Sequence, residues 1–557
     1  MAQLLGLMQT GWKLAIPSII DYAARWHSEQ EVICRTPEGP IVVSTYADLR
    51  QRALLCSMAL KSLGIREGSM VATLAWNTTR HLEAWFGIMG LGACCHTVNP
   101  RLSDKDIRFI INDAQDCVIL SDITFAAQLE RILPDCPAVK SVVFLTDRQH
   151  MPQKCNLLCQ VLCYEELLDG QISGPPFHWV DVDENAACGL CYTSGTTGNP
   201  KGVLYSHRSN YLHAMVAVQP DNWCMGSSST CLAVVPMFHA NAWGTVFAAP
   251  LVGAKLVLPG PYLDGESIYN LMQSFNVTLS VGVPTVWMNL LDYMERFEVR
   301  FKSLKMVCIG GAAAPRSMID TFEKKYGVDV RHLWGMTELS PLGTVCGVKA
   351  AIAGRPQEYI LANKVKQGRP HNLIDMRIVD DSGRVLAHDG KTVGNLQVKG
   401  PCVVREYFKI GKPAVDSEGW FTTGDVCSID KLGHMAVTDR AKDVVKSGGE
   451  WISTIEIENL AMGHHTVAEA AVIAIPSPKW GERPLLLVVL KPHIQQEGEH
   501  ETIKEELYKH LEGRIAKYAM PDDIVFVPEI PHNATGKVSK LVLRDMFKEY
   551  KPPRSRI

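Results

Sequence analysis

The sequence predicts an α/β protein in which a large N-terminal domain of layered sheets and helices is followed by a small α+β C-terminal domain. With 557 residues, the chain is too long for a single hydrophobic core. Strand-like and helix-like segments alternate from the N-terminus onwards, which is typical of largely parallel sheets covered by helices. A charged, glycine-bearing stretch at 444–453 precedes a new alternation. We therefore expect two domains, 1–439 and 440–557, with their boundary near 440–442.

Hydrophobic periodicity places the first elements of the large domain. Helical spacing predicts a helix at 18–26 and another that begins at Tyr46, directly after a strand. The alternation continues with strands at 70–76, 117–120 and 141–145 and helices at 81–90 and 126–132. Residues 149–176 are rich in proline, cysteine and polar residues and are expected to form a surface connection. Cys155, Cys159 and Cys163 are spaced four apart there, which predicts one shared helix face; a metal site would need a further ligand.

Composition and charge bear on the compartment and on several classes of partner. A formal net charge of −3 gives no sign of a nucleic-acid partner. Seventeen unevenly spaced cysteines favour reduced thiols in the cytosol over a disulfide framework. Residues 1–25 lack the basic start and cleavage site of a signal peptide. The most apolar stretch, 243–260, is broken by Pro250 and Lys255, so no membrane span is expected. The final tripeptide Ser555-Arg-Ile faintly resembles a peroxisomal signal, as a random tail often would.

The stretch Thr193-Ser-Gly-Thr-Thr-Gly-Asn-Pro-Lys201 predicts a phosphate-binding loop. Its hydroxyls, its bare backbone and one ammonium group can converge on phosphate oxygens. Pro200 stands where the Walker pattern requires a second glycine, which disfavours a P-loop fold. Taken alone, the stretch is equally compatible with a Gly/Thr-rich surface turn.

An apolar strand at 185–192 is expected to deliver this loop, and a helix at 207–216 to follow it. Cys188 and Cys191 form a Cys-x-x-Cys pair on that strand. A zinc site would need a second pair, and a redox motif would open a helix, so buried small side chains are the favoured interpretation.

Three further stretches end strands in small or aromatic residues. In 234–244, Phe238, His239 and Trp243 cluster around small residues, which suits the wall of a flat, mostly apolar pocket. Taken alone, His239 is more typical of a buried core histidine than of a functional one. The runs at 306–315 and 328–338 are strands that break where a planar base could lie against the backbone. The second run ends in Thr337 and Glu338, a hydroxyl suited to phosphate and a carboxylate suited to Mg²⁺, although Glu338 could also cap a helix.

The last motifs surround the domain boundary and the C-terminus. Asp425 follows a tight turn, a hairpin is expected around 431–433, and Arg440 comes next; a carboxylate and a guanidinium can both bind a ribose or its phosphate. The small domain is expected to contain helices at 454–462 and 503–511 and strands at 470–475 and 484–491. Near its end, 531–538 forms a turn that presents Lys537, which alone could be an ordinary solvated lysine.

Together, the motifs at 193–201, 334–338, 424–425, 439–440, 446–449 and 535–537 resemble the core motifs of the adenylate-forming enzymes, in that family's order and at about its spacing. The resemblance covers nearly the whole chain. Within the superfamily, the phrases at 75–78, 206–209, 236–243 and 447–453 are similar to those of the medium- and long-chain fatty acyl-CoA ligases. The 3-methylmercaptopropionate-CoA ligases are the most similar group.

The resemblance implies an acyl-CoA ligase whose substrates are a carboxylic acid, ATP and coenzyme A, with Mg²⁺ held by Glu338 and Thr193. It also implies that the small domain is mobile about a hinge at Lys442, and related ligases suggest a homodimer. The implied ATP-binding residues are Thr193, Ser194, Gly195, Thr196, Thr197, Gly198 and Lys201 for the β- and γ-phosphates, Gly311, Ala312, Ala313, His332, Trp334, Gly335 and Met336 for adenine, Thr337 for the α-phosphate, and Asp425 and Arg440 for the ribose.

The chemistry of the implied reaction explains the lysines. When a carboxylate attacks the α-phosphorus, negative charge collects on both the attacking and the leaving side, so Lys537 and Lys201 would act by charge and position. The resemblance implies that the small domain then rotates to bring Lys446, Gly448 and Gly449 to coenzyme A, with His239 gating the thiol.

The acid itself is expected to be apolar, because 238–244 offers no carboxylate for a substrate ammonium. The predicted acyl pocket comprises Val235, Phe238, Trp243, Gly310 and Met336. The bulk of Trp243 favours an unbranched short or medium acid, 3-methylthiopropionate included. Two alternatives remain open: an adenylating enzyme that does not use coenzyme A, as in luciferases, and a catalytically silent nucleotide-binding protein.

Overall fold

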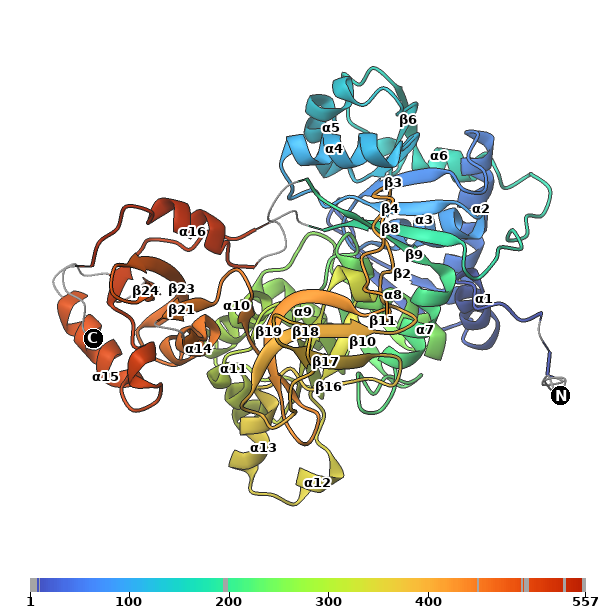
Figure 1. Cartoon of the computed structure of the whole chain (residues 1–557). Coiled ribbons are helices and arrows are strands. Elements are labelled where there is room, and N and C mark those ends of the chain that lie inside the picture. Colours follow the sequence, from blue (N-terminus) through green and yellow to red (C-terminus); the bar gives the residue numbers. More distant parts are fainter. Residues whose placement is uncertain are drawn as a thin grey trace, which may run out of the picture.

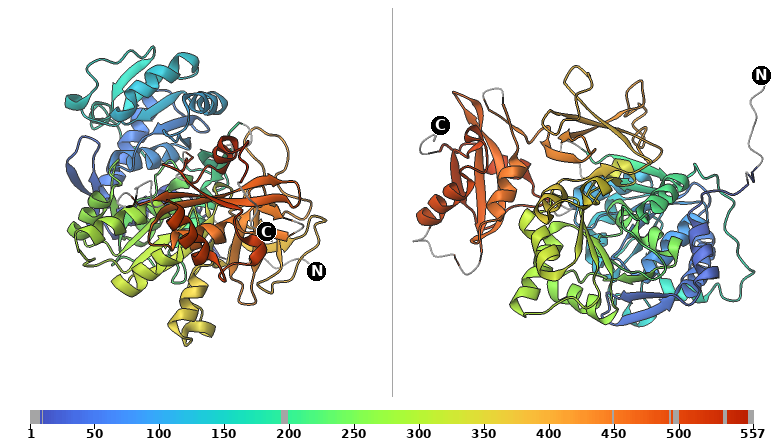
Figure 2. Two further views of the ribbon diagram at one scale, coloured as in Figure 1. Left: turned by 90° about the vertical axis from the view of Figure 1, so that its left-hand side faces the viewer. Right: turned by 90° about the horizontal axis from the view of Figure 1, so that it is seen from below.

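The computed structural model describes residues 8–9, 11–193, 199–447, 450–491, 494, 500–533 and 537–552. It confirms the α/β fold class, with a large N-terminal domain and a smaller C-terminal domain beside it (Figure 1). Two further views separate the small domain and a four-stranded sheet from the main body (Figure 2).

A seven-stranded sheet forms part of the large domain and is parallel except for its last strand. Its order is β7 (Gln160–Cys163), β6 (Ser141–Phe144), β5 (Val118–Ser121), β3 (Met70–Leu74), β4 (Cys94–Thr97), β8 (Ala187–Tyr192) and β9 (Gly202–Ser206). Strands β4, β5 and β6 are buried along their whole length, as expected where helices cover both faces of a parallel sheet.

A nine-stranded sheet also belongs to the large domain, and its central strands are parallel. Its order is β16 (Arg369–Pro370), β15 (Leu342–Val345), β14 (Asp329–Gly335), β13 (Met306–Ile309), β12 (Leu279–Gly282), β10 (Thr230–Ala233), β11 (Lys255–Leu258), β1 (Glu31–Arg35) and β2 (Ile41–Thr45). Because parallel strands end at the same edge, the segments after β10, β12, β13 and β14 meet there.

Helices bury the faces of both sheets in three hydrophobic layers. The largest core lies between the sheets and holds α1 (Pro17–Trp26), α2 (Tyr46–Ser62), α3 (Thr79–Gly90), α7 (His207–Ala217) and α8 (Thr245–Val252). The outer face of the seven-stranded sheet packs against α4 (Asp104–Ala114) and α5 (Ala126–Ile132). The outer face of the nine-stranded sheet packs against α9 (Gly265–Ser274), α10 (Pro284–Arg296), α11 (Arg316–Asp320) and α13 (Gln357–Lys364). Two short helices, α6 (Tyr164–Asp169) and α12 (Ala350–Ala353), complete the domain.

A four-stranded antiparallel sheet leads towards the small domain. Its order is β17 (Asp375–Val379), β18 (Val393–Lys399), β19 (Phe421–Ile429) and β20 (Met435–Arg440). The expected hairpin at 431–433 joins β19 to β20, and Gly433 has a φ of 81°, which suits glycine.

The small domain is a five-stranded sheet with helices on both faces. The strands are β22 (Glu450–Ile452), β21 (Val445–Ser447), β24 (Gly481–Leu490), β23 (Val467–Ser477) and β25 (Asp523–Phe526), the last paired with β24. One face packs against α14 (Thr454–Met462) and α15 (His500–Leu511), and the other against α16 (Lys540–Met546).

Most predicted elements are confirmed within a few residues, whereas the cysteine prediction at 155–163 is wrong. Cys155 and Cys159 lie in a connection and Cys163 ends a strand, so the three share no helix face. In the described residues, no group of three or more His, Cys, Asp or Glu side chains could hold a metal ion. Within the described part of the chain, every helix is too short or too polar to cross a bilayer. All seventeen cysteines are free thiols.

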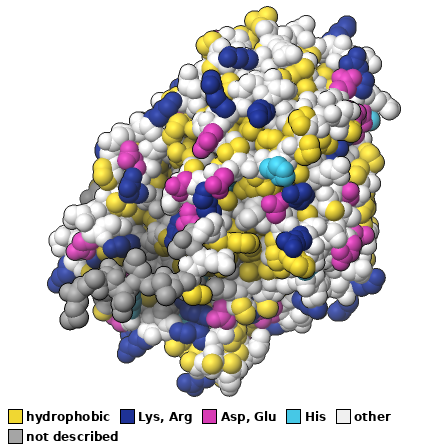
Figure 3. Space-filling model, turned by 90° about the vertical axis from the view of Figure 1, so that its right-hand side faces the viewer, with side chains coloured by type: hydrophobic (Ala, Val, Ile, Leu, Met, Phe, Trp, Pro, Cys, Tyr) yellow, Lys and Arg dark blue, Asp and Glu magenta, His cyan; other side chains and the backbone are white. Residues whose placement is uncertain are grey.

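The surface carries charges of both signs. On the face drawn in Figure 3, basic and acidic side chains are interspersed, with hydrophobic side chains gathered between them. This distribution agrees with the small net charge of −3.

Candidate active site

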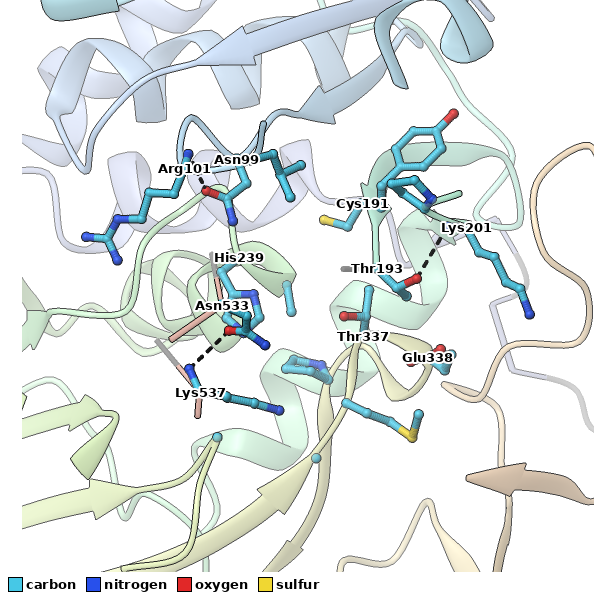
Figure 4. A pocket seen from close by; sticks show the side chains of 18 of the residues that line it. Asn99, Arg101, Cys191, Thr193, Lys201, His239, Thr337, Glu338, Asn533 and Lys537 are labelled. Atoms are coloured by element: carbon cyan, nitrogen blue, oxygen red, sulfur yellow. Dashed lines mark hydrogen bonds between the residues drawn. The ribbon is translucent and has the colours of Figure 1, made fainter. Parts of the chain in front are cut away.

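A cavity of about 610 Å³ lies where the carboxyl ends of β8, β13 and β14 and the segment after β10 face the small domain (Figure 4). The small domain closes it with Asn533 and 537–541. The predicted residues that line it are Thr193, Lys201, Phe238, His239, Trp243, Gly310, Gly311, Trp334, Gly335, Met336, Thr337, Glu338, Arg440, Lys442 and Lys537. The chain thus brings together side chains that lie more than 300 residues apart in sequence.

Several predicted residues lie elsewhere. Val235 lines a smaller cavity of about 210 Å³ that also touches Phe238 and His239. The predicted residues that line neither of these two cavities are Ala312, Ala313, His332, Asp425 and Lys446. Those outside the described residues are Ser194, Gly195, Thr196, Thr197, Gly198, Gly448 and Gly449.

The two ends of the predicted phosphate loop are tied together. Thr193 N donates to Lys201 O at 2.9 Å, and Lys201 N donates to the Thr193 hydroxyl at 3.3 Å. The Lys201 ammonium group lies 5.0 Å from the centre of the Tyr407 ring, an attractive cation–π contact. These contacts place one cation at the cavity wall.

Glu338 and Thr337 lie on a 3₁₀ turn, η6 (Thr337–Leu339), and line the same cavity as that cation. The Tyr407 hydroxyl donates to Glu338 Oε1 at 2.8 Å, and the Tyr205 hydroxyl donates to Thr337 O at 2.7 Å. Glu338 is only 8% exposed. A carboxylate held in this way can present its other oxygen to a cation in the cavity.

Asp425 lies just behind the cavity wall, with both carboxylate oxygens engaged. Arg440 Nε pairs with Oδ1 at 2.8 Å, and Trp334 Nε1 donates to Oδ2 at 2.9 Å. The pairing of β19 with β20 makes Asp425 and Arg440 direct neighbours. Asp425 therefore fixes the orientation of two side chains that line the cavity.

His332 has a structural environment. Its Nδ1 lies 2.8 Å from Val365 O, and its Nε2 accepts from Ala314 N at 3.2 Å. Burial lowers the pKa of His332 to about 4, so the ring is neutral at pH 7. It supports the backbone after β13 and does not face the cavity.

Lys537 enters the cavity from the small domain, close to His239 (Figure 4). Lys537 N donates to Asn533 Oδ1 at 3.1 Å, and Asn533 N donates to Lys537 O at 2.8 Å, which closes the turn that carries the lysine. The pKa of Lys537 is lowered to about 8, first by burial and then by the charge of Arg440, while Asp425 and Glu338 oppose the shift. Burial, with Lys537 and Arg101 nearby, lowers the pKa of His239 to about 4.

Lys446 points away from this cavity. Its ammonium group lies 5.1 Å from the centre of the Trp451 ring, and its backbone N–H donates to Glu482 at 2.8 Å. Lys442, between the four-stranded sheet and the small domain, does line the cavity, and burial lowers its pKa. The two lysines are thus differently placed although only a few residues separate them.

One end of the cavity is apolar. Its wall contains Cys191, Trp223, Ala240, Trp243, Gly310, Leu333 and Leu342. The Trp243 indole lies directly over Gly310 and Gly311, where an added Cβ would come within 3.2 and 3.3 Å of the ring. These described side chains carry no charge, so this end suits an apolar group.

Trp243 belongs to an unusual left-handed turn, η4 (Ala240–Gly244). The φ angles of its five residues are 41°, 58°, 52°, 51° and 80°. Left-handed backbone costs residues other than glycine roughly 1–2 kcal/mol each, so surrounding contacts must stabilise the turn. Only glycine fits at 244, because an added Cβ would come within 2.5 Å of the His213 ring.

Sequence reasoning missed Arg101, Trp223, Tyr407 and Asn533, all of which line the cavity. Arg101 follows β4 by a few residues, so the rule that ligands bind at the carboxyl ends of strands could have found it. Tyr407 and Trp223 lie in connections without a recognisable motif, whereas Asn533 belongs to the predicted turn 531–538 but was not singled out within it.

The chain matches two family models. Residues 21–408 match the model of the AMP-binding enzymes, and residues 456–537 match the AMP-binding enzyme C-terminal domain.

Among curated proteins, the chain is 43% identical to a 3-methylmercaptopropionyl-CoA ligase of Ruegeria lacuscaerulensis, over 98% of this chain and 99% of the relative. It is equally 43% identical to a medium-chain-fatty-acid–CoA ligase of Ectopseudomonas oleovorans, over 96% of each chain. A long-chain-fatty-acid–CoA ligase of Thermus thermophilus is also 43% identical, over 97% of this chain and 96% of the relative.

Among solved structures, an anthranilate CoA ligase in complex with anthranoyl-AMP superposes with a TM-score of 0.83 at 25% identity, covering 95% of this chain and 97% of that one. A benzoate CoA ligase from Burkholderia xenovorans has a TM-score of 0.79 at 21% identity, over 94% and 99% of the two chains.

Proposed function

Since this chain belongs to the AMP-binding enzyme family and is an ATP-dependent acyl-CoA ligase, we propose that its acid is unbranched, apolar and of short or medium length, 3-methylthiopropionate included. The observation that carries this proposal is the apolar end of the cavity, walled by Trp243 over Gly310 and Gly311. A substrate with an ammonium or second carboxylate would leave an unpaired charge buried there. The indole packs against those glycines, and we propose that it limits the chain length.

We propose that Lys537 and Lys201 divide the charge of the first half-reaction. A carboxylate oxygen of the acid attacks the α-phosphorus of ATP, the bond to the β-phosphate oxygen breaks, and pyrophosphate leaves with the electron pair. Lys537 would neutralise the attacking carboxylate and the α-phosphate, while Lys201 would neutralise the leaving pyrophosphate. Both lysines line the same cavity, as this assignment requires.

The nucleotide is proposed to lie along the ends of β13 and β14. Adenine would rest against Gly311, Trp334, Gly335 and Met336, and the Thr337 hydroxyl would donate to the α-phosphate. Arg440 would reach the ribose, and Asp425 would accept from the ribose hydroxyls while it holds Arg440 and Trp334 in place. Ala312, Ala313 and His332 would act through the backbone that shapes this wall.

Glu338 fits the role of a Mg²⁺ ligand. Mg²⁺ is usually bound by one or two carboxylates together with substrate phosphates, and Glu338 presents one nearly buried carboxylate beside Lys201 and Thr193. Bound there with Thr193 as a second ligand, the ion would supply charge neutralisation of the phosphates. The Tyr407 hydroxyl would keep the carboxylate aimed at that position.

For the second half-reaction, we propose that the small domain, 440–557, rotates about Lys442. The thiolate of coenzyme A then attacks the acyl carbonyl carbon, the bond to the phosphate oxygen breaks, and AMP leaves. Rotation would withdraw Lys537 and bring Lys446, together with Gly448 and Gly449, to the acyl-adenylate. In the present orientation Lys537 lines the cavity and Lys446 does not, which supports the proposed role of Lys537 in adenylation.

His239 is proposed to gate the path of the thiol. It lines both the large cavity and the neighbouring cavity of about 210 Å³, together with Phe238 and Arg101, and Val235 lines the smaller one. With a pKa of about 4 the imidazole is neutral at pH 7, so it adds no further cation beside Lys537.

A ligation screen tests the proposed substrate. The purified protein is incubated with ATP, Mg²⁺, coenzyme A and unbranched acids from propionate to palmitate, with 3-methylthiopropionate included. We expect acyl-CoA, AMP and pyrophosphate in equal amounts, with kcat/KM highest for short or medium acids. A maximum at palmitate would refute the proposed chain length. AMP release without a thioester would favour an adenylating enzyme of the luciferase type, and no pyrophosphate with any acid would favour a silent nucleotide-binding protein.

We further propose that the enzyme works in the cytosol as a homodimer. Seventeen free thiols suit a reducing compartment. Light scattering of the purified protein tests the dimer, and a mass of one chain would refute it.

A further inference from the structure

The left-handed turn at the apolar end of the cavity has one amide side chain, that of Asn241. Asn241 is 2% exposed. Its Nδ2 donates to Asn210 Oδ1 at 3.2 Å, and its Oδ1 accepts from the Cys191 thiol at 3.6 Å. Asn210 lies on α7 and Cys191 on β8, so this single amide ties the turn to two separate elements.

The turn decides where the Trp243 side chain points. The sign of φ fixes the direction of each Cα–Cβ bond relative to the chain, so a right-handed path through the same residues would aim the indole elsewhere. In the left-handed path, the indole covers Gly310 and Gly311 and closes the apolar end of the cavity. The position of this wall therefore depends on the contacts that stabilise the turn.

Asn241 is well suited to stabilise it. Asparagine tolerates positive φ better than other residues except glycine, whereas Ala240, Ala242 and Trp243 have no such tolerance. Thr245 also closes the turn, because its hydroxyl donates to Ala242 O at 2.8 Å and its backbone N–H donates to the same oxygen. The Asn210 amide is itself anchored, since its Nδ2 lies 3.4 Å from Cys188 Sγ on β8.

We propose that Asn241, held by Asn210, is a positioning residue for acyl-chain length: it keeps the turn left-handed and thereby holds the Trp243 indole as the end wall of the acyl pocket. This inference rests on the proposed function of the cavity. It assigns the chain-length limit to a buried amide pair that touches neither the acid nor the nucleotide.

The test compares the wild type with Asn241→Ala and Asn210→Ala across the same series of acids. The readout is the ratio of kcat/KM for the acid that the wild type uses best to kcat/KM for the acid two carbons longer. Because the end wall is no longer fixed, we expect this ratio to fall by about tenfold in both variants. An apolar pocket discriminates by about this factor between substrates that differ by one methylene group. The KM for ATP should change less than this ratio. Gly311 contacts the indole and belongs to the proposed adenine wall, but Trp334, Gly335 and Met336 come from β14 and the residue after it.

Two further variants separate positioning from general loss of structure. Asn241→Gly keeps a backbone that adopts positive φ readily but removes the amide, and it should show the same change in chain-length ratio as Asn241→Ala. Asn363→Ala is a matched control: Asn363 is also a buried asparagine, whose Nδ2 donates to Tyr359 O at 2.9 Å, and it does not line the cavity. It should lower the melting temperature without changing the chain-length ratio.

A double variant tests whether Asn241 acts through Trp243. In the Trp243→Ala background the wall is already gone, so adding Asn241→Ala should change the chain-length ratio by less than about twofold. The inference is overturned if Asn241→Gly keeps the wild-type ratio, if Asn241→Ala still shifts it about tenfold without Trp243, or if all acids and ATP are affected equally. A wild type that forms no acyl-CoA would instead overturn the proposed function, so the two failures are distinguishable.

Discussion

At the scale of single residues, the charge of Lys537 should control the first half-reaction. Lys537→Ala removes the cation that faces the attacking carboxylate, and we expect the rate of acyl-adenylate formation to fall by about 100-fold or more. Pyrophosphate release in single-turnover experiments measures this step. The same variant, supplied with synthetic acyl-adenylate and coenzyme A, should form thioester at close to the wild-type rate. A full rate of adenylation would contradict the role of this lysine.

The lowered pKa of Lys537 predicts an alkaline limit for adenylation. The ammonium form is the active one, so kcat/KM should fall as pH rises through about 8, the pKa of the free enzyme. Bound carboxylate and phosphate favour the charged form, so the corresponding limb of kcat should lie at higher pH. Profiles of pyrophosphate release against pH, measured for kcat/KM and for kcat, test whether the limb of kcat lies at the higher pH. If the alkaline limbs of kcat/KM and kcat lie at the same pH, a group other than Lys537 titrates.

Glu338 should determine the requirement for Mg²⁺. Glu338→Gln keeps the size of the side chain and an acceptor for the Tyr407 hydroxyl but removes the negative charge. We expect the Mg²⁺ concentration at half-maximal rate to rise by at least about tenfold, the effect seen when even an outer partner of a metal is lost. Glu418→Gln is the control, because Glu418 is exposed, pairs with Arg377 at 3.1 Å and does not line the cavity. An unchanged Mg²⁺ dependence in Glu338→Gln would exclude it as the ligand.

Residue-level prediction from sequence succeeded where a motif combines a strand end with a distinctive residue type. Thr337, Glu338 and Lys201 follow strands directly or belong to a glycine-rich loop, and all three line the cavity. His332 belongs to the predicted run 328–338, as Thr337 and Glu338 do. Side chains alternate between the two faces along β14, and this alternation turns the His332 ring towards Ala314 and Val365. Tyr407 could not be predicted, because its contacts with Glu338 and Lys201 depend on how a distant connection folds back.

At the scale of elements, local signals predicted helices better than they predicted turns. α14 begins after Ser453, whose side chain accepts from Glu456 N, and its predicted and observed bounds agree. The left-handed turn at Ala240–Gly244 contradicts the intrinsic preference of alanine and tryptophan. It exists because Asn241, Thr245 and the close approach of Gly244 to His213 outweigh that preference, and none of these tertiary contacts can be read from sequence.

The segment between β20 and β21 should act as the hinge, and a proline tests it. In the described structure, Ala441, Asp443 and Val444 donate their N–H groups to backbone carbonyls, whereas the Lys442 N–H does not. Lys442→Pro therefore loses no backbone bond, but it restricts φ at the proposed pivot. We expect pyrophosphate release to stay within about threefold of the wild type and thioester formation to slow by about 100-fold, the scale on which misplaced groups lose activity. Equal loss in both half-reactions would argue against a pivot at this residue.

The control for the hinge variant is Lys442→Ala, which removes the side chain and leaves the backbone free. If Lys442 matters as a pivot, Lys442→Ala should retain thioester formation that Lys442→Pro loses. If both variants slow the second half-reaction alike, the side chain and not the backbone carries the effect.

At the scale of the whole molecule, our proposal assigns two lysines of the small domain to opposite orientations of that domain. The sequence predicted a large and a small domain from length and from the renewed alternation of elements, and the structure confirms both. It could not predict their relative placement, because the contacts between the two domains are non-local. Thr454 N–H of α14 donates to Asp439 of β20 at 3.1 Å, and the Ser453 hydroxyl donates to Thr438 O at 2.7 Å. Relative motion of two domains is the default expectation unless the interface between them is large and hydrophobic.

Lys446→Ala should therefore separate the two half-reactions in the sense opposite to Lys537→Ala. Lys446 lies outside the cavity in the present orientation, so its loss should leave the first turnover of pyrophosphate release unchanged. Acyl-adenylate should then accumulate to about one equivalent per site, and thioester formation should slow by roughly tenfold or more because a group that meets the second transition state is gone. Quenched-flow measurement of pyrophosphate, acyl-adenylate and acyl-CoA in one reaction follows all three.

Lys479→Ala is the matched control for this last variant, since both lysines belong to the small domain and each stacks on a tryptophan. The Lys479 ammonium group lies 4.4 Å from the Trp480 ring centre, compared with 5.1 Å between Lys446 and Trp451. Loss of a surface cation–π contact should cost each variant about 0.5–1 kcal/mol of stability, so any difference in thioester formation reflects position and not folding. If Lys479→Ala stalls at acyl-adenylate as well, or if Lys446→Ala shows no accumulation, the rotation that brings Lys446 to the adenylate is refuted.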